Sequence, residues 1–497
     1  MCYEGKMSEK NRFSRLLKHL MTVAGIKNYA LAQELKYDVS YISKWTGGQM
    51  IPSEKYASKI LKGISECIVT QCGAEAATGL MQEYQVENKS DLQQAIWDNL
   101  EAEYNYVRDL QNSPDANVIL GLQFWPEMKI AQFVVKMRHP VLRRVSSLNI
   151  VGAFDIFALE REYQLQIIEA KNKHVSKGKW YQDVHYYMVI NVQKDTLDYS
   201  HDISFLVELL DRNRCIDFRL YGSAGAAGKA IFAVEDDYMI SGLLVSGNHC
   251  VSVVTSENSD NCRSVFRSVK GLCSQENQLF RKTSMREMIL KHEYVHGLFA
   301  LCQQWIIGHL TEHFLPEDLF EEIVEQIAGQ KDEEENESPA LDELRSIHKI
   351  ARNAVEDFEI SILLYRTAFY NLVVDNEIDF FNYKVHLTQK QIIRCLEYFI
   401  ELCRNHQKLK IKMVSGRLIP NMDYETRYCI LLNDTISHIR LDGDYNNMYI
   451  ISRIDMRDAF VKTFYEFWEK RSDSLITDRE IIIANVEQVI NGIKGNS

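Results

Sequence analysis

Proline is scarce in this 497-residue sequence, and its cysteines form no recognisable pattern. Seven prolines, against an average usage of about 5%, favour long uninterrupted elements and mainly helices. The 11 cysteines are scattered from Cys2 to Cys429 without a Cys-x-x-Cys pair, so neither a disulfide framework nor a zinc ribbon is indicated. We interpret them as buried free thiols.

Long hydrophobic runs are lacking as well. No apolar run reaches the roughly 18–20 residues that span a bilayer, and residues 1–10 are too polar for a signal peptide. Hydrophobic residues make up 46% and charged residues 25%, which is a globular composition and excludes a disordered or collagen-like chain. We expect a cytoplasmic protein of about three domains with no membrane partner.

The net charge of −12 argues against a nucleic-acid partner for the chain as a whole. The charge is uneven, however. Residues 1–65 hold 11 Lys+Arg and 5 Asp+Glu, a net charge of +6, which leaves −18 on the remainder. A basic head on an acidic body favours local contact with DNA, because the body limits non-specific adhesion to phosphates.

The basic head has the spacing of several short helices. Apolar residues recur at helical spacing from Asn11 to Ala24. Asn28 is a suitable N-cap for a helix over Tyr29–Leu35, and Asp38 for a second helix over Val39–Trp45. Two short helices joined by a three-residue turn and flanked by packing helices predict a helix-turn-helix.

The second of these helices has a glycine stop at Gly47-Gly48. Pro52-Ser53 then opens another helix. Its apolar positions are Tyr56, Ile60, Leu61 and Ile64.

These residues resemble the lambda-repressor-like (XRE) helix-turn-helix family over about residues 12–66. The positions in register are the run Leu31-Ala32-Gln33-Glu34-Leu35, the run Ser40-Tyr41-Ile42-Ser43-Lys44-Trp45, Gly48 and Pro52-Ser53. Lys36 stands where the family usually has glycine. A non-glycine residue at positive φ costs about 1 kcal/mol, so we expect a slightly altered turn.

The resemblance implies DNA binding by the second helix of the motif, whose N-terminal side chains would reach base edges in the major groove. Lys44 would donate to guanine or phosphate, Ser40 to either, and Val39 would contact a thymine methyl. Ile42 and Trp45 are expected in the core. By the family pattern the DNA-binding positions are Asn28 (phosphate contact), Val39, Ser40, Tyr41 and Lys44.

Residues 67–125 are predicted to form a helical connector, with an apolar stripe at helical spacing from Asp91 to Leu110. The stripe would pack on the chain's own body or on a partner chain.

An internal repeat follows, from about residue 126 to 480. Each copy reads strand–helix–strand–strand–strand–helix. The matching strands of the two copies are His185–Val192 with Asp379–His386, Asp217–Gly222 with Lys410–Gly416, Lys229–Val234 with Arg427–Leu432, and Val251–Thr255 with Tyr449–Ser452. Long helices over about 284–329 and an acidic run at 332–337, interpreted as a solvated linker, lie between the copies.

The order of elements resembles the two-lobed phospholipase D-like fold. Activity in that family needs a His-x-Lys followed by Asp in each half, to supply a nucleophile and an acid. Here Ala227 stands where the histidine before Lys229 should be, and Glu425 precedes Arg427. The resemblance therefore implies a catalytically inactive version, kept as a sensor or dimerisation body.

One metal motif competes with this interpretation. His292-Glu293-Tyr294-Val295-His296 matches His-Glu-x-x-His, which on a helix holds zinc between two imidazoles with the glutamate as general base. A helix over Met285–Phe299 is predicted. The third ligand would be Glu312, Glu317 or Glu321; His309 and His313 repeat the spacing with less support. We expect no bound metal and keep His292, Glu293 and His296 as a minor alternative.

Three further patterns are weaker. Asp155 with Glu169-Ala170-Lys171 resembles the strand-borne Asp…Glu-x-Lys of metal-dependent nucleases, with strands expected over 150–159 and 164–170. The glycine-rich segment 222–228 lacks phosphate-loop spacing and is interpreted as a flexible loop that could line a ligand cleft. A solvated basic helix face, alternatively an auxiliary phosphate contact, is expected from Lys136, Arg138, His139, Arg143 and Arg144.

The sequence thus predicts an α+β multidomain protein. Its expected parts are an all-α helix-turn-helix at 1–66, a helical connector at 67–125, an α/β lobe at 126–275, a helical insert with an acidic linker at 276–360, and a second α/β lobe with a C-terminal helix at 361–497. The hypothesis is a homodimeric, sequence-specific transcriptional regulator without a cofactor, not an enzyme, that binds double-stranded DNA. Its body would take a small-molecule or peptide ligand. The alternatives are a zinc metallopeptidase-type regulator and an adaptor that binds a protein partner.

Overall fold

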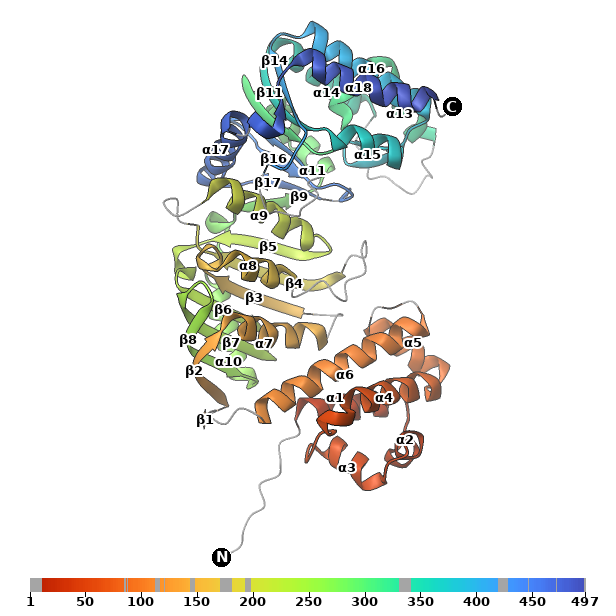
Figure 1. The fold of residues 1–497 in the computed structure, drawn as a ribbon, viewed down its shortest axis with the longest axis vertical. Helices are drawn as coiled ribbons and strands as arrows, with labels where there is room; N and C mark the ends of the chain where they lie inside the picture. The colour runs from red at the N-terminus through yellow and green to blue at the C-terminus, as the bar shows by residue number, and fades with distance from the viewer. Residues whose placement is uncertain are drawn as a thin grey trace, which may run out of the picture. The chain divides into compact units, whose positions relative to one another are not determined.

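The structure is a computed structural model that describes residues 11–84, 86, 88–111, 117–119, 121–143, 148–169, 181–192, 198–329, 341–418, 428–445, 447–470 and 472–495. The chain divides into two compact units, Met1–Gln193 with Arg212–Ser274, and Lys194–Asp211 with Gln275–Ser497. Each unit carries one large mixed sheet with helices (Figure 1). The predicted α+β class is confirmed, while the five domain boundaries stay predictions. None of the described helices combines the length and apolar character needed to cross a membrane.

The first unit begins with a purely helical region. Its helices are α1 (Arg12–Val23), α2 (Asn28–Leu35), α3 (Val39–Gly47), α4 (Ala57–Gln71), α5 (Ala74–Glu83) and α6 (Lys89–Gln111). Asn11 caps α1, since its Oδ1 accepts from the Ser14 backbone N–H at 2.9 Å. The long helix α6 contacts α1, α4 and α5, and it buries Ile96, Leu100 and Val107 against them.

The connector is not helical throughout, which corrects the expectation for residues 67–125. Two strands, β1 (Asn117–Ile119) and β2 (Leu122–Lys129), follow α6. β2 contains Phe124 and Trp125, residue types that favour strands, and it pairs antiparallel with β8 (His249–Ser256). Pairing with a strand more than a hundred residues away, rather than local periodicity, decides this segment.

The first sheet has the strand order β1-β2-β8-β7-β6-β3-β4-β5. Its other strands are β3 (Leu148–Phe154), β4 (Tyr181–Ile190), β5 (Ile216–Gly222), β6 (Lys229–Val234) and β7 (Tyr238–Ser246). β3, β4 and β5 are parallel neighbours, and β3 also pairs antiparallel with β6. The chain then runs antiparallel from β6 through β7 and β8 to β2.

Helices connect the strands of this sheet. They are α7 (Ile130–Arg143) and α8 (Arg161–Glu169), together with α9 (Tyr199–Arg212), which groups largely with the second unit. A further helix, α10 (Ser259–Lys270), follows β8 at the end of the first sheet. The strand expected over residues 164–170 is wrong, because the described part is α8. Gln164 and Ile167 are both buried, which is the i, i+3 spacing of one helical face.

The second sheet has the order β18-β14-β11-β10-β15-β16-β17-β9. Its strands are β9 (Phe280–Thr283), β10 (Cys302–Ile307), β11 (Glu359–Tyr365), β14 (Leu409–Val414), β15 (Cys429–Leu432), β16 (His438–Arg440), β17 (Met448–Ile451) and β18 (Leu475–Ile476). β10, β11 and β14 are parallel neighbours, β10 pairs antiparallel with β15, and the antiparallel run continues through β16 and β17 to β9. Seven strands therefore follow the same pairing scheme in both sheets.

Two expectations for this region are wrong. Residues 276–360 were expected to be a helical insert, yet β9 and β10 lie there and belong to the second sheet. The segment Asp379–His386 was matched with the front strand of the first copy. It instead forms a separate hairpin of β12 (Glu377–Phe380) and β13 (Tyr383–His386). By its place in the sheet, β11 is the counterpart of β4. The strands β7 and β16 were missed in the repeat.

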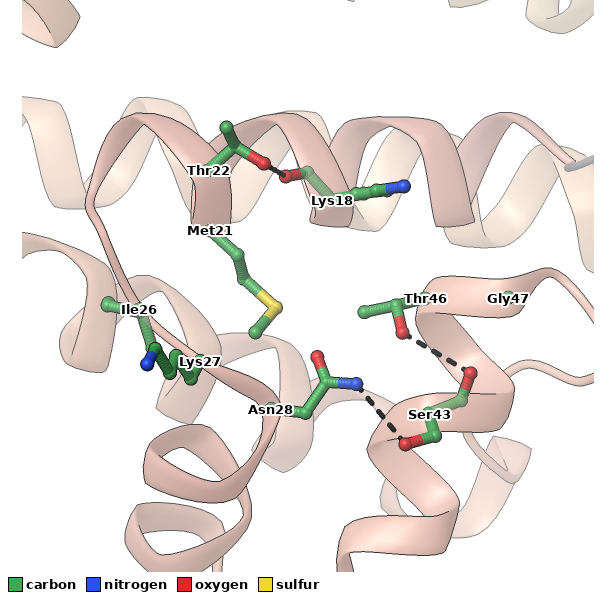
Figure 2. Close-up of a pocket in the computed structure, with 9 residues that line it drawn as sticks. All are labelled: Lys18, Met21, Thr22, Ile26, Lys27, Asn28, Ser43, Thr46 and Gly47. Atoms are coloured by element: carbon green, nitrogen blue, oxygen red, sulfur yellow. Dashed lines mark hydrogen bonds between the residues drawn. The ribbon is translucent and has the colours of Figure 1, made fainter.

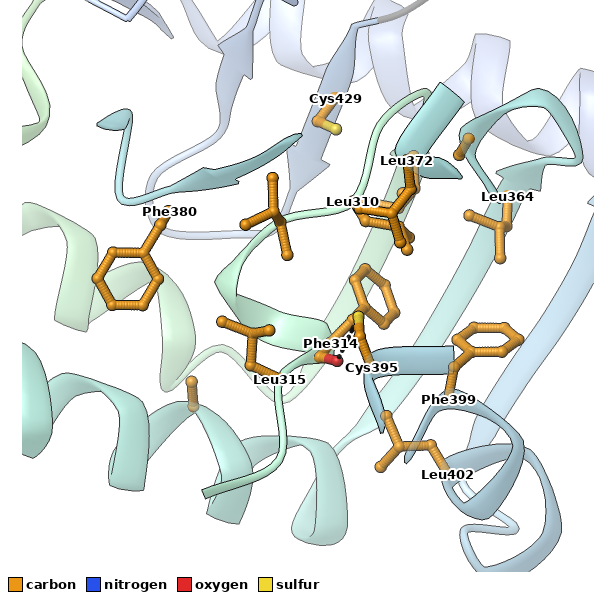
Figure 3. Close-up of a cluster of buried hydrophobic side chains, with 14 of the residues drawn as sticks. Leu310, Phe314, Leu315, Leu364, Leu372, Phe380, Cys395, Phe399, Leu402 and Cys429 are labelled. Atoms are coloured by element: carbon orange, nitrogen blue, oxygen red, sulfur yellow. Dashed lines mark hydrogen bonds between the residues drawn. The ribbon is translucent and has the colours of Figure 1, made fainter. Parts of the chain in front are cut away.

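Besides α9, the helices of the second unit are α11 (Met285–Leu290), α12 (Glu293–Leu298), α13 (Glu317–Gly329), α14 (Leu341–Asp357), α15 (Thr367–Asp375), α16 (Gln389–Asn405), α17 (Ile454–Lys470) and α18 (Arg479–Gly495). A capping box between Thr388 and Gln391 fixes the start of α16. Its apolar face contributes Phe399 and Cys395 to the core of this unit, where the Cys395 thiol donates to the Phe314 carbonyl at 3.3 Å (Figure 3).

Candidate nucleic-acid interface

The predicted helix-turn-helix corresponds to α2, a short turn and α3. α2 ends at Leu35, and Lys36 adopts the left-handed conformation with φ 58° and ψ 40°. Lys36 takes the left-handed conformation that glycine favours, and the expectation of a turn altered relative to the family stays a prediction. α3 is capped by Asp38, whose carboxylate accepts from the Ser40 backbone N–H at 2.9 Å, and it ends at Gly47, followed by Gly48 as the C-cap with φ 78°.

α3 divides its side chains between the core and solvent. Ile42 and Trp45 are buried, as predicted. The face away from the core exposes Val39, Ser40, Tyr41, Ser43 and Lys44. Four predicted base-contacting residues thus lie exposed on one short helix, and Ser43 joins them as a residue that sequence reasoning missed.

Tyr41 is exposed but not loose. Its ring lies 6.0 Å from that of Tyr37 and 6.4 Å from that of Trp45, centroid to centroid. Because packing holds the ring, the side chain can present its hydroxyl group at low entropic cost.

Ser40 has a competing partner. Hydrogen bonds from the side chain and the backbone of Ser40 hold the pKa of Asp38 below its ordinary value. The Ser40 hydroxyl therefore has to leave Asp38, or to bridge to it, when it contacts a base. The Asp38 carboxylate lies at the start of α3, where it stabilises the helix dipole but repels phosphate.

Asn28 does not act as the N-cap that the sequence suggested. α2 begins at Asn28 itself, and Lys27 precedes it without a side-chain capping hydrogen bond. The Asn28 amide Nδ2 instead donates to the Ser43 hydroxyl oxygen at 3.2 Å, which ties the start of α2 to α3 (Figure 2). Because the Asn28 side chain bonds to α3, it does not cap α2, and the first N–H groups of α2 have no side-chain partner from the N-cap residue.

A hollow of about 470 Å³ opens beside this uncapped helix start (Figure 2). It is lined by Lys18, Met21, Thr22, Ile26, Lys27, Asn28, Ser43, Thr46 and Gly47. Two lysines and the N-terminus of an eight-residue helix give it positive potential, and hydroxyl groups line the α3 side. This chemistry suits a phosphate group of a DNA backbone.

One tie between the helices was not expected from the sequence. The Asn11 amide Nδ2 donates to the Gly48 carbonyl at 3.1 Å and so joins the start of α1 to the end of α3. Asn11 also caps α1. An asparagine in a capping position is the only feature of the sequence that marks this residue, and it gives no indication of the contact with Gly48.

The zinc motif does not form the helix it needs. The predicted helix over Met285–Phe299 is broken into α11 and α12, and His292 between them is left-handed with φ 56°. Both His292 and His296 are exposed, while Glu293 pairs with Arg281 at 2.7 Å. In the described part of the chain, no group of three His, Cys, Asp or Glu residues is arranged to hold a metal ion.

The proposed third ligands point elsewhere. Glu317 pairs with Arg352 at 2.6 Å, and Glu321 pairs with Arg345 at 2.8 Å. Glu312 is fully buried and bonds to Arg440 at 2.8 and 3.0 Å.

Arg440 is the centre of a buried charged group that sequence reasoning missed. Its Nε atom donates to Asp379 at 3.1 Å and its Nη2 atom lies 2.6 Å from that carboxylate, and the His309 Nε2 lies 3.2 Å from the same carboxylate. Arg440 is 1% exposed. Burial raises the pKa of Glu312, but Arg440 and His313 together lower it by more, and the net pKa of Glu312 is lowered. Asp379 and Arg440 lie 61 residues or more from each other and from the pair His309 and Glu312, so no local pattern indicates the group.

The nuclease pattern is also not assembled as expected. Asp155 follows β3, and its carboxylate accepts from the Gly228 backbone N–H at 2.7 Å and from the Asn191 amide at 3.1 Å. Glu169 lies in α8 rather than on a strand. Ala170 and Lys171 lie outside the described residues.

The glycine-rich segment is a short ordered connection. It contains a single 3-10 turn over Ala224–Ala226, with Ala226 fully buried, and Lys229 donates to the Gly225 carbonyl at 2.8 Å. Glu425, Arg427 and the acidic run at 332–337 lie outside the described residues.

The basic stretch begins on α7 as expected. Lys136 lies over the Trp125 ring at 4.6 Å from its centroid. The structure describes no side chains for Arg138, His139 and Arg143, and Arg144 lies outside the described residues.

No protein-family model and no curated protein sequence matches this chain. The resemblance to the XRE family therefore stands on the residues of α1 to α4 themselves.

Proposed function

We propose that this protein is a sequence-specific DNA-binding transcriptional regulator, with α3 as the recognition helix and the α/β body as a sensor, a dimerisation body or both. The observation that carries the proposal is the exposed face of α3. Lys44, Ser40 and Val39 are exposed on it, while Trp45 and Ile42 anchor the opposite side. A helix of this size fits the major groove, where such side chains reach base edges.

The hollow beside α2 supports the same assignment. Lys18, Lys27 and the uncapped N–H groups of α2 would hold one backbone phosphate and thereby fix the register of α3 in the groove. Asn28 keeps the two helices in this relation through its bond to Ser43.

A homodimer follows from the size of the head. One helix-turn-helix buries too little surface for specific affinity at physiological salt, so two heads would bind two half-sites. The body would set their spacing. A small-molecule or peptide ligand that binds one spacing better would change DNA affinity. We place the protein in the cytoplasm and assign it no cofactor.

We further propose that the two sheets are copies of one unit and that the body is an inactive relative of the phospholipase D-like fold. Seven strands with one pairing scheme in each sheet support the duplication. Ala227 in place of the nucleophilic histidine before Lys229 supports the loss of activity.

The direct test is selection of sheared genomic DNA by the purified full-length protein at about 150 mM salt, where non-specific binding is weak. Enrichment of a few fragments that share an inverted repeat is expected. The absence of enrichment over unselected DNA, with and without added cell extract as a ligand source, would contradict the proposal.

A zinc peptidase is the second candidate, and the motif at His292 is its only support. Since α11 and α12 do not form one helix, the two imidazoles do not project as a zinc-binding pair. We expect substoichiometric zinc by atomic emission after purification in zinc-containing buffer, and no change in His296→Ala. One zinc per chain, lost in His296→Ala, would favour the enzyme. For the adaptor alternative, a stoichiometric co-purifying protein would be the evidence.

A further inference from the structure

The start of α1 contacts the α/β part of the same unit through the side chain of one arginine. Arg12 is the first residue of α1 and is 3% exposed, which is rare for an arginine. Its side chain lies where α1, α6, β7 and the end of β8 converge. Arginine in such a place needs charged and hydrogen-bonding partners, because an unpaired buried charge is costly.

Arg12 has partners on the sheet side. The Nε atom lies 2.5 Å from a carboxylate oxygen of Glu257, which directly follows β8. The Nη2 atom donates to the Asp237 carbonyl at 3.1 Å, in the turn between β6 and β7, and lies 3.8 Å from the Asp237 carboxylate. The guanidinium therefore binds two separate loops of the first sheet.

Two aromatic rings complete the site. The guanidinium carbon lies 5.1 Å from the ring centroid of Tyr106 on α6 and 5.4 Å from that of Tyr238 on β7. These two rings contact each other edge to face at 6.3 Å. Both tyrosines are buried, so the cation–π contacts are formed away from water, where they are strongest.

Arg15 provides a built-in comparison. It lies on the same helix and contacts the other oxygen of Glu257 at 3.2 Å. Its side chain is 57% exposed, whereas that of Arg12 is 2% exposed. Exposed ion pairs contribute little, while breaking a buried one strands a charge. The two arginines should therefore differ sharply in effect although they share a partner.

We propose that Arg12 is a positioning residue that fixes the DNA-binding head to the first α/β sheet, so that a ligand or partner that displaces the β6–β7 turn or the end of β8 changes the direction of α3. This inference rests on the proposed function for its consequence on DNA. The attachment itself is independent of DNA binding. α1 contacts both α3 and α6, so a movement at Arg12 is carried to the recognition helix by packed elements.

The test compares Arg12→Met with Arg15→Met, which remove the same kind of charge from the same helix. Hydrogen exchange of the full-length protein is followed in three places: the β6–β7 turn, the end of β8 and α3. Arg12→Met is expected to raise exchange in the first two about tenfold or more, because a buried pair is broken, and to leave α3 protected. Arg15→Met is expected to change exchange less than about twofold.

Glu257→Gln guards against a folding defect of the head. It removes the charge from the sheet side and leaves every residue of α1 to α4 in place. If Arg12→Met also speeds up hydrogen exchange in α3, the head itself is destabilised and the Glu257→Gln variant is the one to compare. Faster exchange at the β6–β7 turn in Glu257→Gln, with α3 still protected, supports the inference. Wild-type exchange at that turn in Glu257→Gln overturns it, as does equal behaviour of Arg12→Met and Arg15→Met.

The DNA arm uses a fragment selected from genomic DNA and a second version with five base pairs, about half a helical turn, inserted between its half-sites. The wild-type protein is expected to lose at least about tenfold in affinity for the lengthened fragment, and Glu257→Gln distinctly less. An equal loss in both proteins overturns the positioning role. If no fragment is bound by the wild-type protein, the proposed function fails, while the exchange experiment still tests the attachment of the head.

Discussion

At the scale of single residues, two charged side chains are buried, whereas the proposed recognition side chains are exposed. Arg12 and Arg440 are both buried with carboxylates, whereas Lys44 and Ser40 are exposed on a short helix. Removing a buried arginine destabilises the fold, because its carboxylate partners are then left buried without a counter-charge. An exposed lysine on α3 has no such structural task, so its substitution should affect binding and not folding.

The Arg440 group gives a stability prediction. Arg440→Met leaves Glu312 and Asp379 buried without their shared cation, which should lower the free energy of unfolding by about 3–5 kcal/mol. Arg453→Met is the matched control, because Arg453 is partly exposed and pairs with Asp455 two residues away. Urea unfolding followed by circular dichroism measures both. A loss in Arg440→Met no larger than in Arg453→Met would show that the group is not a stabilising unit.

The same group makes stability depend on pH. Burial lowers the pKa of His309, but Cys429 and Asp379 outweigh it, and the net pKa lies well above its ordinary value. A raised pKa stabilises the folded state fully below the pKa of the unfolded chain, and this stabilisation is lost as the pH rises through the folded-state pKa. The free energy of unfolding of the second unit should therefore decrease as the pH rises from neutral to alkaline values.

His309→Gln should flatten this dependence, whereas His386→Gln should leave it unchanged, because the His386 side chain is 71% exposed. The comparison is made by urea unfolding at several pH values. Parallel curves for the wild-type protein and His309→Gln would refute the assignment.

At the scale of elements, local chemistry predicted the head well and the body less well. Asp38 before α3, Gly48 after it and the apolar spacing of α1 were all sufficient to place these helices, because each signal lies within a few residues of its effect. The breaks at Lys36 and His292 show the difference. Lys36 lies at the end of a helix that the family pattern also ends, whereas nothing near His292 marks a left-handed residue between two helices.

Long-range pairing accounts for the failures in the body. The sequence predicts a helical stretch at β10, yet this strand lies in the second sheet between β11 and β15. β16 has three residues, too few for a periodic signal, and Arg440 at its end is fully buried. β10 is decided by its pairing with β15, more than a hundred residues away, and the same separation joins Glu312 to Arg440, so sequence spacing carries no information about these contacts.

The turn between α2 and α3 gives a prediction at this scale. Lys36 has φ 58°, so Lys36→Gly should relieve the left-handed strain and stabilise the head by about 1 kcal/mol. Lys27→Gly, at φ −89°, should give no gain. Hydrogen exchange of the α2 and α3 amides measures the opening free energy in each variant. Equal protection in Lys36→Gly and the wild-type protein would mean that the turn carries no such strain.

At the scale of the whole molecule, the charge distribution and the fold agree on a division of labour. The net positive charge is confined to residues 1–65, which include α1 to α3 and most of α4, and the remainder, with α5, α6 and the two α/β sheets, is acidic. The proposed phosphate contacts at α2 lie within this basic part of the chain. The account therefore depends on one claim, that the exposed face of α3 reads DNA sequence.

The most direct measurement of that claim is the affinity of the full-length protein for a fragment selected from genomic DNA, relative to a scrambled fragment of equal length. Lys44→Ala and Ser40→Ala should each weaken specific binding by about 1–3 kcal/mol and reduce this ratio, while Lys59→Ala, an exposed lysine on α4, should leave the ratio unchanged. If Lys44→Ala and Ser40→Ala retain the wild-type ratio, α3 is not the recognition helix and the account is contradicted.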